Sequence, residues 1–373
     1  MPIIEYDRVS VLRPIRGKYM KMTKKWIFAI LILIAAVIAA VLFSAKPTST
    51  KSTAAVNLTG SGSTFAIPLL DACKAGYTVA SGNTYTYTGG GSGAGRTASD
   101  KGINDFNFSD TPHTAATRLA TVIHVPVIAA PIAVMYKMYL AAPLNLSAAT
   151  IAGIFSGSIT KWNDTAIAAD NAGIRLPATT IHVIYRSDAS GTTGNFTNFL
   201  HGMAPSIWVK PGSNDFKSGF PGAIDSSANL GRVVGAAGSS GVTALAESTP
   251  DSITYAERGY AKAAGLSIAY IKNAAGHFQA PNASGTSAFL GAATVNANGY
   301  LTFNYNATVP DAYPLGIVSY ALVDTKSKNA MAIKSFLSYI LNSKCSTANP
   351  SLAYAAISGP LLSVDQAQIA KIG

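Results

Sequence analysis

Short apolar runs alternate along this chain with segments whose apolar residues recur at helical spacing. Three nearly continuous apolar runs predict buried strands, at residues 122–136, 180–186 and 313–323. Three segments with helical periodicity predict helices, at residues 147–157, 194–203 and 330–342. This alternation of strand and helix predicts an α/β architecture. Residues 204–252 are rich in Gly and Ser, and their pattern predicts no definite element.

The N-terminal segment differs from the rest of the chain. Residues 26–45 form an uncharged, almost wholly apolar run, about as long as a helix that crosses a bilayer. The preceding tail, 1–25, is basic, which favours an N-terminus inside the cell and an exported body. An uncleaved anchor is favoured, but a cleaved signal peptide starting at Met20 or Met22 also fits. The polar residues 46–57 predict a flexible spacer.

The charge balance excludes some classes of protein. The formal net charge is +11, of which the tail carries +5 and residues 46–373 carry +6. This modest excess favours small anions, and because no basic stripe alternates with aromatic residues, nucleic acid is not an expected partner. The five histidines show no metal-ligand spacing, so no metal or cofactor is expected, and His113 is expected at the surface. Cys73 and Cys345 are either disulfide-bonded or two buried thiols.

Three loops of small residues open predicted helices. Their helix-start residues are Ser63, Thr64 and Phe65 in 60–77, Ser92, Gly93 and Ala94 in 88–102, and Ser190, Gly191 and Thr192 in 188–200. A helix N-terminus has unpaired N–H groups and a partial positive charge, and glycine lets a ligand approach the backbone. One such loop could be ordinary capping. Three in one exported chain favour a bound oxyanion.

The third loop also carries Arg186 and Asp188. Its arginine could bind an oxyanion, or the two residues could form a structural ion pair. The loops do not match nucleotide-binding motifs: the string GGGSGAG lacks the Lys-Ser/Thr of a P-loop, and the following Arg96 gives only weak support to a dinucleotide fold. No G-x-S-x-G elbow is present, which argues against an α/β hydrolase.

Five motifs in this order carry a resemblance to a known family: GSGSTFAIPLL, YTGGGSGAGR, DFNFSDTPH, SGSITKWNDTAI and YRSDASGTTGNFTNFL. From about Leu58 to the C-terminus the chain resembles the periplasmic phosphate-binding protein of the phosphate ABC transporter. The resemblance implies a type II periplasmic-binding-protein fold, in which two α/β lobes close by a hinge motion over one dehydrated phosphate. Lobe 1 is expected at 58–135 plus 310–373 and lobe 2 at 136–309. Both cysteines then fall in lobe 1, which permits a disulfide.

The resemblance also implies a ligand set. Its members are Thr64, Phe65 (through its backbone N–H), Ser92, Asp110, Arg186, Ser190, Gly191 and Thr192, with Asp188 holding the arginine. Asp110 would accept a hydrogen bond from a protonated phosphate oxygen, which sulfate lacks, although on its own it could cap a following helix. The signature residues Trp162, Asn163 and Asp164 are expected to serve as turn and cap residues.

The expected function is therefore that of an extracytoplasmic binding protein, not an enzyme. It would capture inorganic phosphate as a monomer and deliver it to an ABC transporter permease in the membrane. The N-terminal segment lacks the lipoprotein cysteine of some relatives, so the mode of anchoring stays open. Two alternatives remain: a binding protein for another oxyanion, such as sulfate or arsenate, and a secreted phosphatase-like hydrolase.

Overall fold

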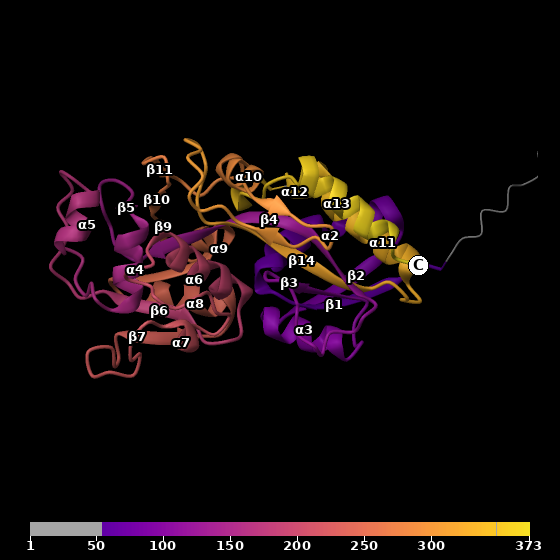
Figure 1. Cartoon of the computed structure of the whole chain (residues 1–373), viewed down its shortest axis with the longest axis horizontal. Coiled ribbons are helices and arrows are strands. Elements are labelled where there is room, and N and C mark those ends of the chain that lie inside the picture. The colour runs from indigo at the N-terminus through magenta and orange to yellow at the C-terminus, as the bar shows by residue number, and fades with distance from the viewer. Residues whose placement is uncertain (1–53, 348) are drawn as a thin grey trace, which may run out of the picture. The chain divides into compact units, whose positions relative to one another are not determined.

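The computed structural model describes residues 54–347 and 349–373 (Figure 1). The predictions for residues 1–25 and 26–45, and for most of the spacer 46–57, lie outside these residues. Within the described part, no helix has both the length and the apolar character needed to cross a membrane. Residues 55–373 form one compact unit.

A nine-stranded sheet runs through this unit. Its order is β2-β1-β3-β14-β4-β8-β6-β7, and the short β9 also pairs with β4. The strands are β1 (Asn57–Gly62), β2 (Thr84–Gly89), β3 (Phe106–Ser109), β4 (Val122–Tyr136), β6 (His182–Arg186), β7 (Val233–Ala236), β8 (Ser252–Glu257), β9 (Ser267–Ile268) and β14 (Gly316–Asp324). Two small sheets accompany it, made by β5 (Asn145–Leu146), β10 (Tyr270–Lys272) and β11 (Phe278–Gln279), and by β12 (Thr294–Val295) and β13 (Leu301–Thr302).

The long strand β4 joins two lobes. Its first part, up to Pro131, pairs antiparallel with β14, and the remainder, from Ile132, pairs antiparallel with β8. On one side β1, β2 and β3 run parallel to one another, and on the other side β6, β7 and β8 do the same. Figure 1 shows β4 and β14 between these two groups. The fold is a two-lobed α/β fold, as expected from the sequence.

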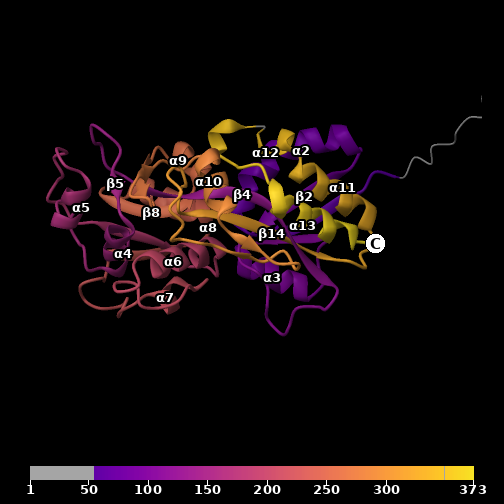
Figure 2. The same cartoon turned by 45° about the horizontal axis from the view of Figure 1, so that its top comes forward.

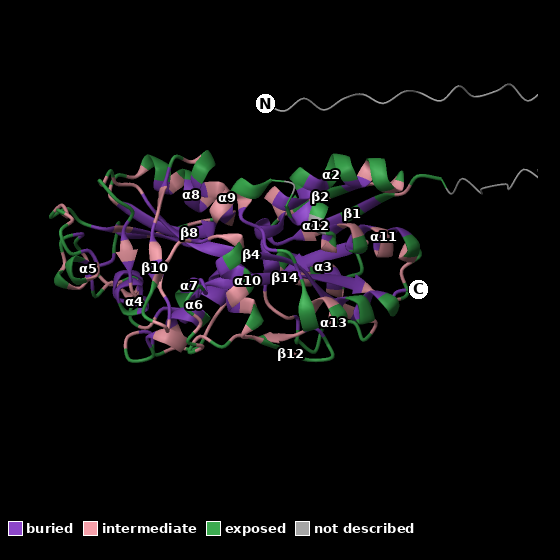
Figure 3. Ribbon diagram, turned by 90° about the horizontal axis from the view of Figure 1, so that it is seen from above, coloured by how far each residue is buried: buried purple, intermediate pink, exposed green. Residues whose placement is uncertain are grey.

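Helices cover both faces of the sheet. They are α2 (Ile67–Ser81), α3 (Ser92–Asp100), α4 (Ala148–Ser156), α5 (Thr165–Asp170), α6 (Gly191–Met203), α7 (Phe216–Gly219), α8 (Gly238–Ser248), α9 (Arg258–Ala263), α10 (Ala283–Gly291), α11 (Ala330–Leu341), α12 (Ser343–Ser346) and α13 (Gly359–Ala370), with 3-10 turns η1 (Thr64–Ala66) and η2 (Pro350–Leu352). Helices α2, α11, α12 and α13 pack together over one lobe (Figure 2). The sheet is buried, while the outer faces of these helices are exposed (Figure 3).

The strongest sequence patterns are confirmed. The run 122–136 is β4 with the predicted bounds, and the other predicted strands correspond to β6 and β14. The predicted helices correspond to α4, α6 and α11, although α6 begins at Gly191 rather than 194 because Ser190 caps it. The weakly patterned residues 204–252 contain α7, β7 and α8.

A disulfide and an aromatic cluster stabilise the first lobe. Cys73 of α2 and Cys345 of α12 are bonded, with 5.3 Å between their Cα atoms. The rings of Tyr77 in α2 and Tyr85 in β2 pack against the ring of Phe336 in α11, with centroid distances of 5.6 and 4.9 Å. Such buried ring contacts add specific geometry to the apolar burial that stabilises the lobe.

His113 and Asp164 differ in how well the sequence predicted their places. His113 was expected at the surface, and this is wrong: it is only 3% exposed, and its Nε2 lies 2.6 Å from Asp100 Oδ1. Its backbone N–H also donates to His124 Nε2, so the segment after β3 folds inward. Asp164 caps α5 by accepting from the N–H of Ala166, as its motif predicts.

Candidate functional site

The three small-residue loops meet at one place because each follows a strand that ends there. Ser63 follows β1, Ser92 follows β2 and Ser190 follows β6. The carboxyl ends of the parallel strands β1 and β2 share one edge of the sheet, where such folds place their ligands. Strand β6 runs in the opposite direction on the other side of β14 and β4, so its carboxyl end faces theirs. The second and third loops touch directly, since the N–H of Gly93 donates to the carbonyl of Ala189 at 2.8 Å. The sequence signal of three helix starts therefore corresponds to a single site.

Asp110, which follows β3, lies at the centre of these loops and is 3% exposed. It does not cap a helix, since none begins in the residues that follow it. Three hydroxyl groups donate to it: Ser63 (2.7 Å) and Ser92 (3.2 Å) to Oδ2, and Ser319 (2.7 Å) to Oδ1; Thr192 Oγ1 lies 3.4 Å from Oδ2. Burial raises the pKa of Asp110, and the hydrogen bonds from the hydroxyl groups and the charge of Arg186 only partly offset this.

Arg186 ends β6 and is 1% exposed. Asp188 accepts from its Nε at 2.7 Å and from its Nη2 at 2.5 Å, while Nη1 donates to Ser239 Oγ at 3.1 Å. Burial alone would lower the pKa of Arg186, but Asp188 reverses this and raises it; the same pairing lowers the pKa of Asp188. The two residues form an ion pair, and this pairing aims the free edge of the guanidinium at the loops.

The remaining predicted residues lie in the same cluster. Thr64 Oγ1 is 3.0 Å from Ser239 Oγ, and the Cα of Gly191 is so close to Ser92 that an added Cβ would lie 2.5 Å from Ser92 Oγ. Two predicted residues have local partners: the N–H of Phe65 donates to Ser63 Oγ, and Ser190 Oγ accepts from the N–H of Thr193.

Ser239 was missed by the sequence reasoning. It opens α8 within Gly-Ser-Ser-Gly, residues 238–241, which is a fourth small-residue loop that follows a strand. Its N–H donates to Thr64 Oγ1 at 3.2 Å, so it links the two groups of parallel strands across the site. The signal that marked the other loops was present here, but the weak pattern of 204–252 concealed the strand and the helix around it.

Glu257 was also missed. It ends β8, is 1% exposed, and its Oε1 accepts from Thr192 Oγ1 at 3.2 Å. Burial raises the pKa of Glu257 to about 7; Asp110 adds to the rise and Arg186 opposes it. The feature of the sequence that could have identified Glu257 is a single carboxyl at the end of an apolar strand.

Arg96, whose role the sequence left open, is bonded within the protein. Its Nη1 donates to Ser109 Oγ and Thr111 Oγ1 at 3.1 and 3.0 Å. With its amide oxygen turned toward Arg96, as the hydrogen-bond network requires, Asn214 accepts from Nη1 and Nη2 at 2.8 and 2.9 Å. Arg96 thus connects α3 to the segment after α6 and does not simply face solvent.

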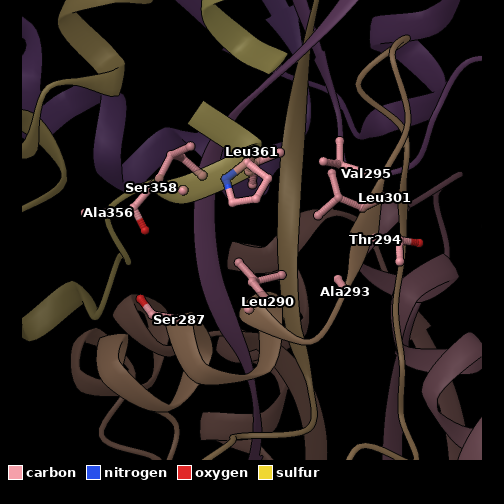
Figure 4. Close-up of a pocket in the computed structure, with 13 residues that line it drawn as sticks. Ser287, Leu290, Ala293, Thr294, Val295, Leu301, Ala356, Ser358 and Leu361 are labelled. Atoms are coloured by element: carbon pink, nitrogen blue, oxygen red, sulfur yellow. The ribbon is translucent and has the colours of Figure 1, made fainter. Parts of the chain in front are cut away.

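One hollow elsewhere in the described structure is unsuited to an anion. It has a volume of about 160 Å³ and lies between α10, the β12–β13 hairpin and the start of α13 (Figure 4). Its lining includes Leu290, Val295, Leu301 and Leu361 and no charged side chain. Among residues 54–347 and 349–373, no group of three or more His, Cys, Asp or Glu is placed to hold a metal ion. The buried donors around Arg186, where the expected ligand residues meet, are the candidate site.

A two-lobed fold with a buried cluster of donors between the carboxyl ends of its strands defines a solute-binding protein of the periplasmic type. The family model described as PBP superfamily domain matches residues 47–344. The chain belongs to this family and, within it, to the phosphate-binding proteins called PstS. It is 36% identical to phosphate-binding protein PstS 3 of Mycobacterium tuberculosis (strain ATCC 25618 / H37Rv) over 272 residues, which cover 69% of this chain and 70% of the relative. Identity to phosphate-binding protein PstS of Xylella fastidiosa (strain Temecula1 / ATCC 700964) is 31% over 300 residues, 79% of each chain.

Solved structures show the same fold. A high affinity periplasmic phosphate-binding protein (PfluDING) bound with phosphate has a TM-score of 0.67 at 22% identity, covering 83% of this chain and 93% of that one. A phosphate-binding protein from Stenotrophomonas maltophilia has a TM-score of 0.60 at 18% identity, with the same coverage. The family consists of substrate-binding proteins rather than enzymes.

Proposed function

We propose that this protein captures inorganic phosphate between its two lobes outside the cytoplasm and delivers it to the permease of an ABC transporter. The observation that carries this proposal is the position of Asp110, a buried carboxyl that shares one cluster with Arg186 and three helix-start loops. An oxyanion needs the donors and the positive charge, but only a protonated oxyanion has use for the acceptor. The names of the curated relatives support the same ligand.

The proposed ligands are those expected from the sequence. Arg186 supplies the balancing charge, held in place by Asp188, and Asp110 accepts a hydrogen bond from a protonated oxygen of the bound phosphate. Donors to the other phosphate oxygens are Thr64, Phe65 (N–H), Ser92, Ser190, Gly191 (N–H) and Thr192. Closure of the lobes would complete this set, since these residues come from both sides of β4.

We assign lobe 1 to residues 58–135 plus 310–373 and lobe 2 to 136–309, so that the chain crosses between the lobes twice. The change of partner along β4, from β14 to β8, supports a crossing near Pro131 to Tyr136. Residues 26–45 would hold the N-terminus in the membrane, and the protein would act as a monomer, because one chain supplies the whole proposed site.

Titration calorimetry of inorganic phosphate into the purified full-length chain tests the proposal. We expect binding that weakens at least about 100-fold in Arg186→Ala, because truncation leaves the anion without its paired charge. Arg175→Ala, which removes an exposed arginine, should leave the affinity unchanged. Absence of both binding heat and protection from unfolding by phosphate would contradict the proposal. Sulfate binding as tight as phosphate binding would instead indicate a different oxyanion.

A further inference from the structure

The site contains a second buried carboxyl, Glu257, besides Asp110. Its Oε1 lies 3.2 Å from Thr192 Oγ1, and the same hydroxyl lies 3.4 Å from Asp110 Oδ2. The other oxygen, Oε2, is buried and has no hydrogen-bond partner among the described residues. Glu257 is therefore part of the anion cluster, joined to Asp110 through Thr192.

The charges in this cluster disfavour ionisation of all three carboxyls when an anion binds. Asp110, Asp188 and Glu257 would contribute three negative charges if ionised, against the guanidinium of Arg186 and that of Arg96 beside Asp110, and a phosphate would add more. Like charges in a buried site raise one another's proton affinity, so a proton on one carboxyl is favoured.

Hydrogen bonding decides which carboxyl holds the proton. Asp188 is paired along both oxygens with Arg186, which favours its ionised form. Asp110 accepts from the hydroxyl groups of Ser63, Ser92 and Ser319, and such bonds also favour a carboxylate. Glu257 has a hydroxyl contact with Thr192, a weaker interaction with the side chain of Ser239, and one oxygen without a hydrogen-bond partner among the described residues. Its ionised form is the least supported of the three.

We propose that Glu257 is a neutral carboxylic acid in the phosphate-bound protein and donates its proton to Thr192 Oγ1. The contact at 3.2 Å then runs from the acid to the hydroxyl oxygen, and the O–H of Thr192 is released to donate to the anion. Asp110 remains ionised and accepts from the protonated phosphate. The two carboxyls thus take opposite roles, and Glu257 is a positioning residue for Thr192. This inference rests on the proposed phosphate-binding function.

The inference implies that affinity depends on pH through Glu257. Four titratable or charged groups interact with Glu257 from the surrounding elements: Arg186 at the end of β6, Asp110 after β3, Tyr260 of α9 and Tyr354 after η2. Burial raises the pKa of Glu257 to about 7, so its free carboxyl ionises as the solution becomes alkaline. Phosphate binding above this pH then requires Glu257 to take up a proton.

The test compares wild type with Glu257→Gln by titration of inorganic phosphate into the full-length chain at about pH 6 and about pH 8.5. Glutamine keeps a donor beside Thr192 and never ionises, so at the lower pH the two affinities should agree within about threefold. From about pH 6 to about pH 8.5, the ratio of the wild-type Kd to the variant Kd should rise at least about tenfold. Because both proteins bind the same phosphate, the titration of phosphate itself cancels in this ratio. Glu247→Gln, on the exposed face of α8, is the matched control and should track wild type.

A second measurement counts protons. Titrations at about pH 8.5 in buffers of different ionisation enthalpy should show about one more proton taken up per phosphate bound by wild type than by Glu257→Gln, because protons taken up by phosphate itself cancel in this difference. A ratio independent of pH, a large loss of affinity in Glu257→Gln at the lower pH, or equal proton uptake by the two proteins would each overturn the inference while leaving phosphate binding intact. Wild type that fails to bind phosphate at either pH would overturn the proposed function as well.

Discussion

Asp188 accepts two parallel hydrogen bonds from the guanidinium of Arg186, at 2.7 Å to Nε and 2.5 Å to Nη2. The same carboxylate accepts from the N–H of Gly238 at 2.9 Å, at the start of α8. It therefore fixes the arginine relative to a second helix N-terminus and leaves Nη1 and the second N–H of Nη2 to bond elsewhere.

Asp188→Asn should weaken phosphate binding about tenfold, because an amide cannot accept both guanidinium N–H groups and the orientation of Arg186 is lost. Calorimetry measures this change. Asp225→Asn, which alters an exposed carboxylate, should bind as wild type does. Equal affinities of Asp188→Asn and wild type would show that the arginine needs no partner to hold it.

Asp110→Asn should reduce the selectivity of the site for phosphate over sulfate. An amide can donate to an oxygen without a proton, so sulfate should now compete with phosphate, while phosphate affinity falls at least about tenfold. Competition calorimetry with the two anions at neutral pH checks both effects. A variant that still excludes sulfate would refute the role given to Asp110.

Gly191→Ala should reduce phosphate affinity at least about 100-fold without unfolding either lobe. A Cβ there would lie 2.5 Å from Ser92 Oγ and 2.7 Å from Asp110 Cβ, so the loops could not meet as they do. Calorimetry and thermal unfolding separate the two effects. Gly291→Ala in α10, where an added Cβ meets nothing within 4 Å, is the control and should bind normally.

Replacing both Cys73 and Cys345 by Ala should lower the free energy of unfolding by about 3–5 kcal/mol, since the bond closes a very long loop in the unfolded chain. Urea denaturation measures this loss, and wild type with added reductant should show a comparable one. Phosphate affinity should persist in folded protein, because neither cysteine belongs to the anion cluster. Unchanged unfolding would mean that the bond contributes nothing.

Asp365→Asn should stabilise the protein at alkaline pH. Asp365 of α13 is fully buried, neither of its oxygens has a partner among the described residues, and burial raises the pKa of its carboxyl to about 9. The folded state keeps a proton that the unfolded chain releases above about pH 4, so the wild-type free energy of unfolding falls as pH rises from about 4 to 9.

The asparagine variant lacks this dependence. We expect its free energy of unfolding to exceed that of wild type by at least about 2 kcal/mol at pH 8, and the difference to vanish near pH 4. Urea denaturation at the two pH values checks this, with Asp311→Asn as an exposed control. A difference independent of pH would show that the carboxyl does not titrate as its burial implies.

Local patterns were sufficient for much of the fold. The run 122–136 became β4 unchanged because every one of its residues except Ile123 is buried, so no polar face interrupts the apolar signal. The segment 204–252 could not be interpreted in this way. Its strand β7 has only four residues, too few to show a period, and α8 starts with Gly-Ser-Ser-Gly, so its first turn carries no apolar side chain.

The sequence by itself determined which residues begin helices and which strands are buried, because capping and burial act between near neighbours in the chain. It thereby located Thr64, Ser92 and the loop 190–192 that follows Arg186, and the resemblance to the phosphate-binding family added Asp110. Only the tertiary structure decided that Thr64 meets Ser239, 175 residues away, and that Glu257 shares Thr192 with Asp110. These contacts depend on the order of strands in the sheet, which sets β3 and β8 on either side of β14 and β4, and no local pattern specifies that order.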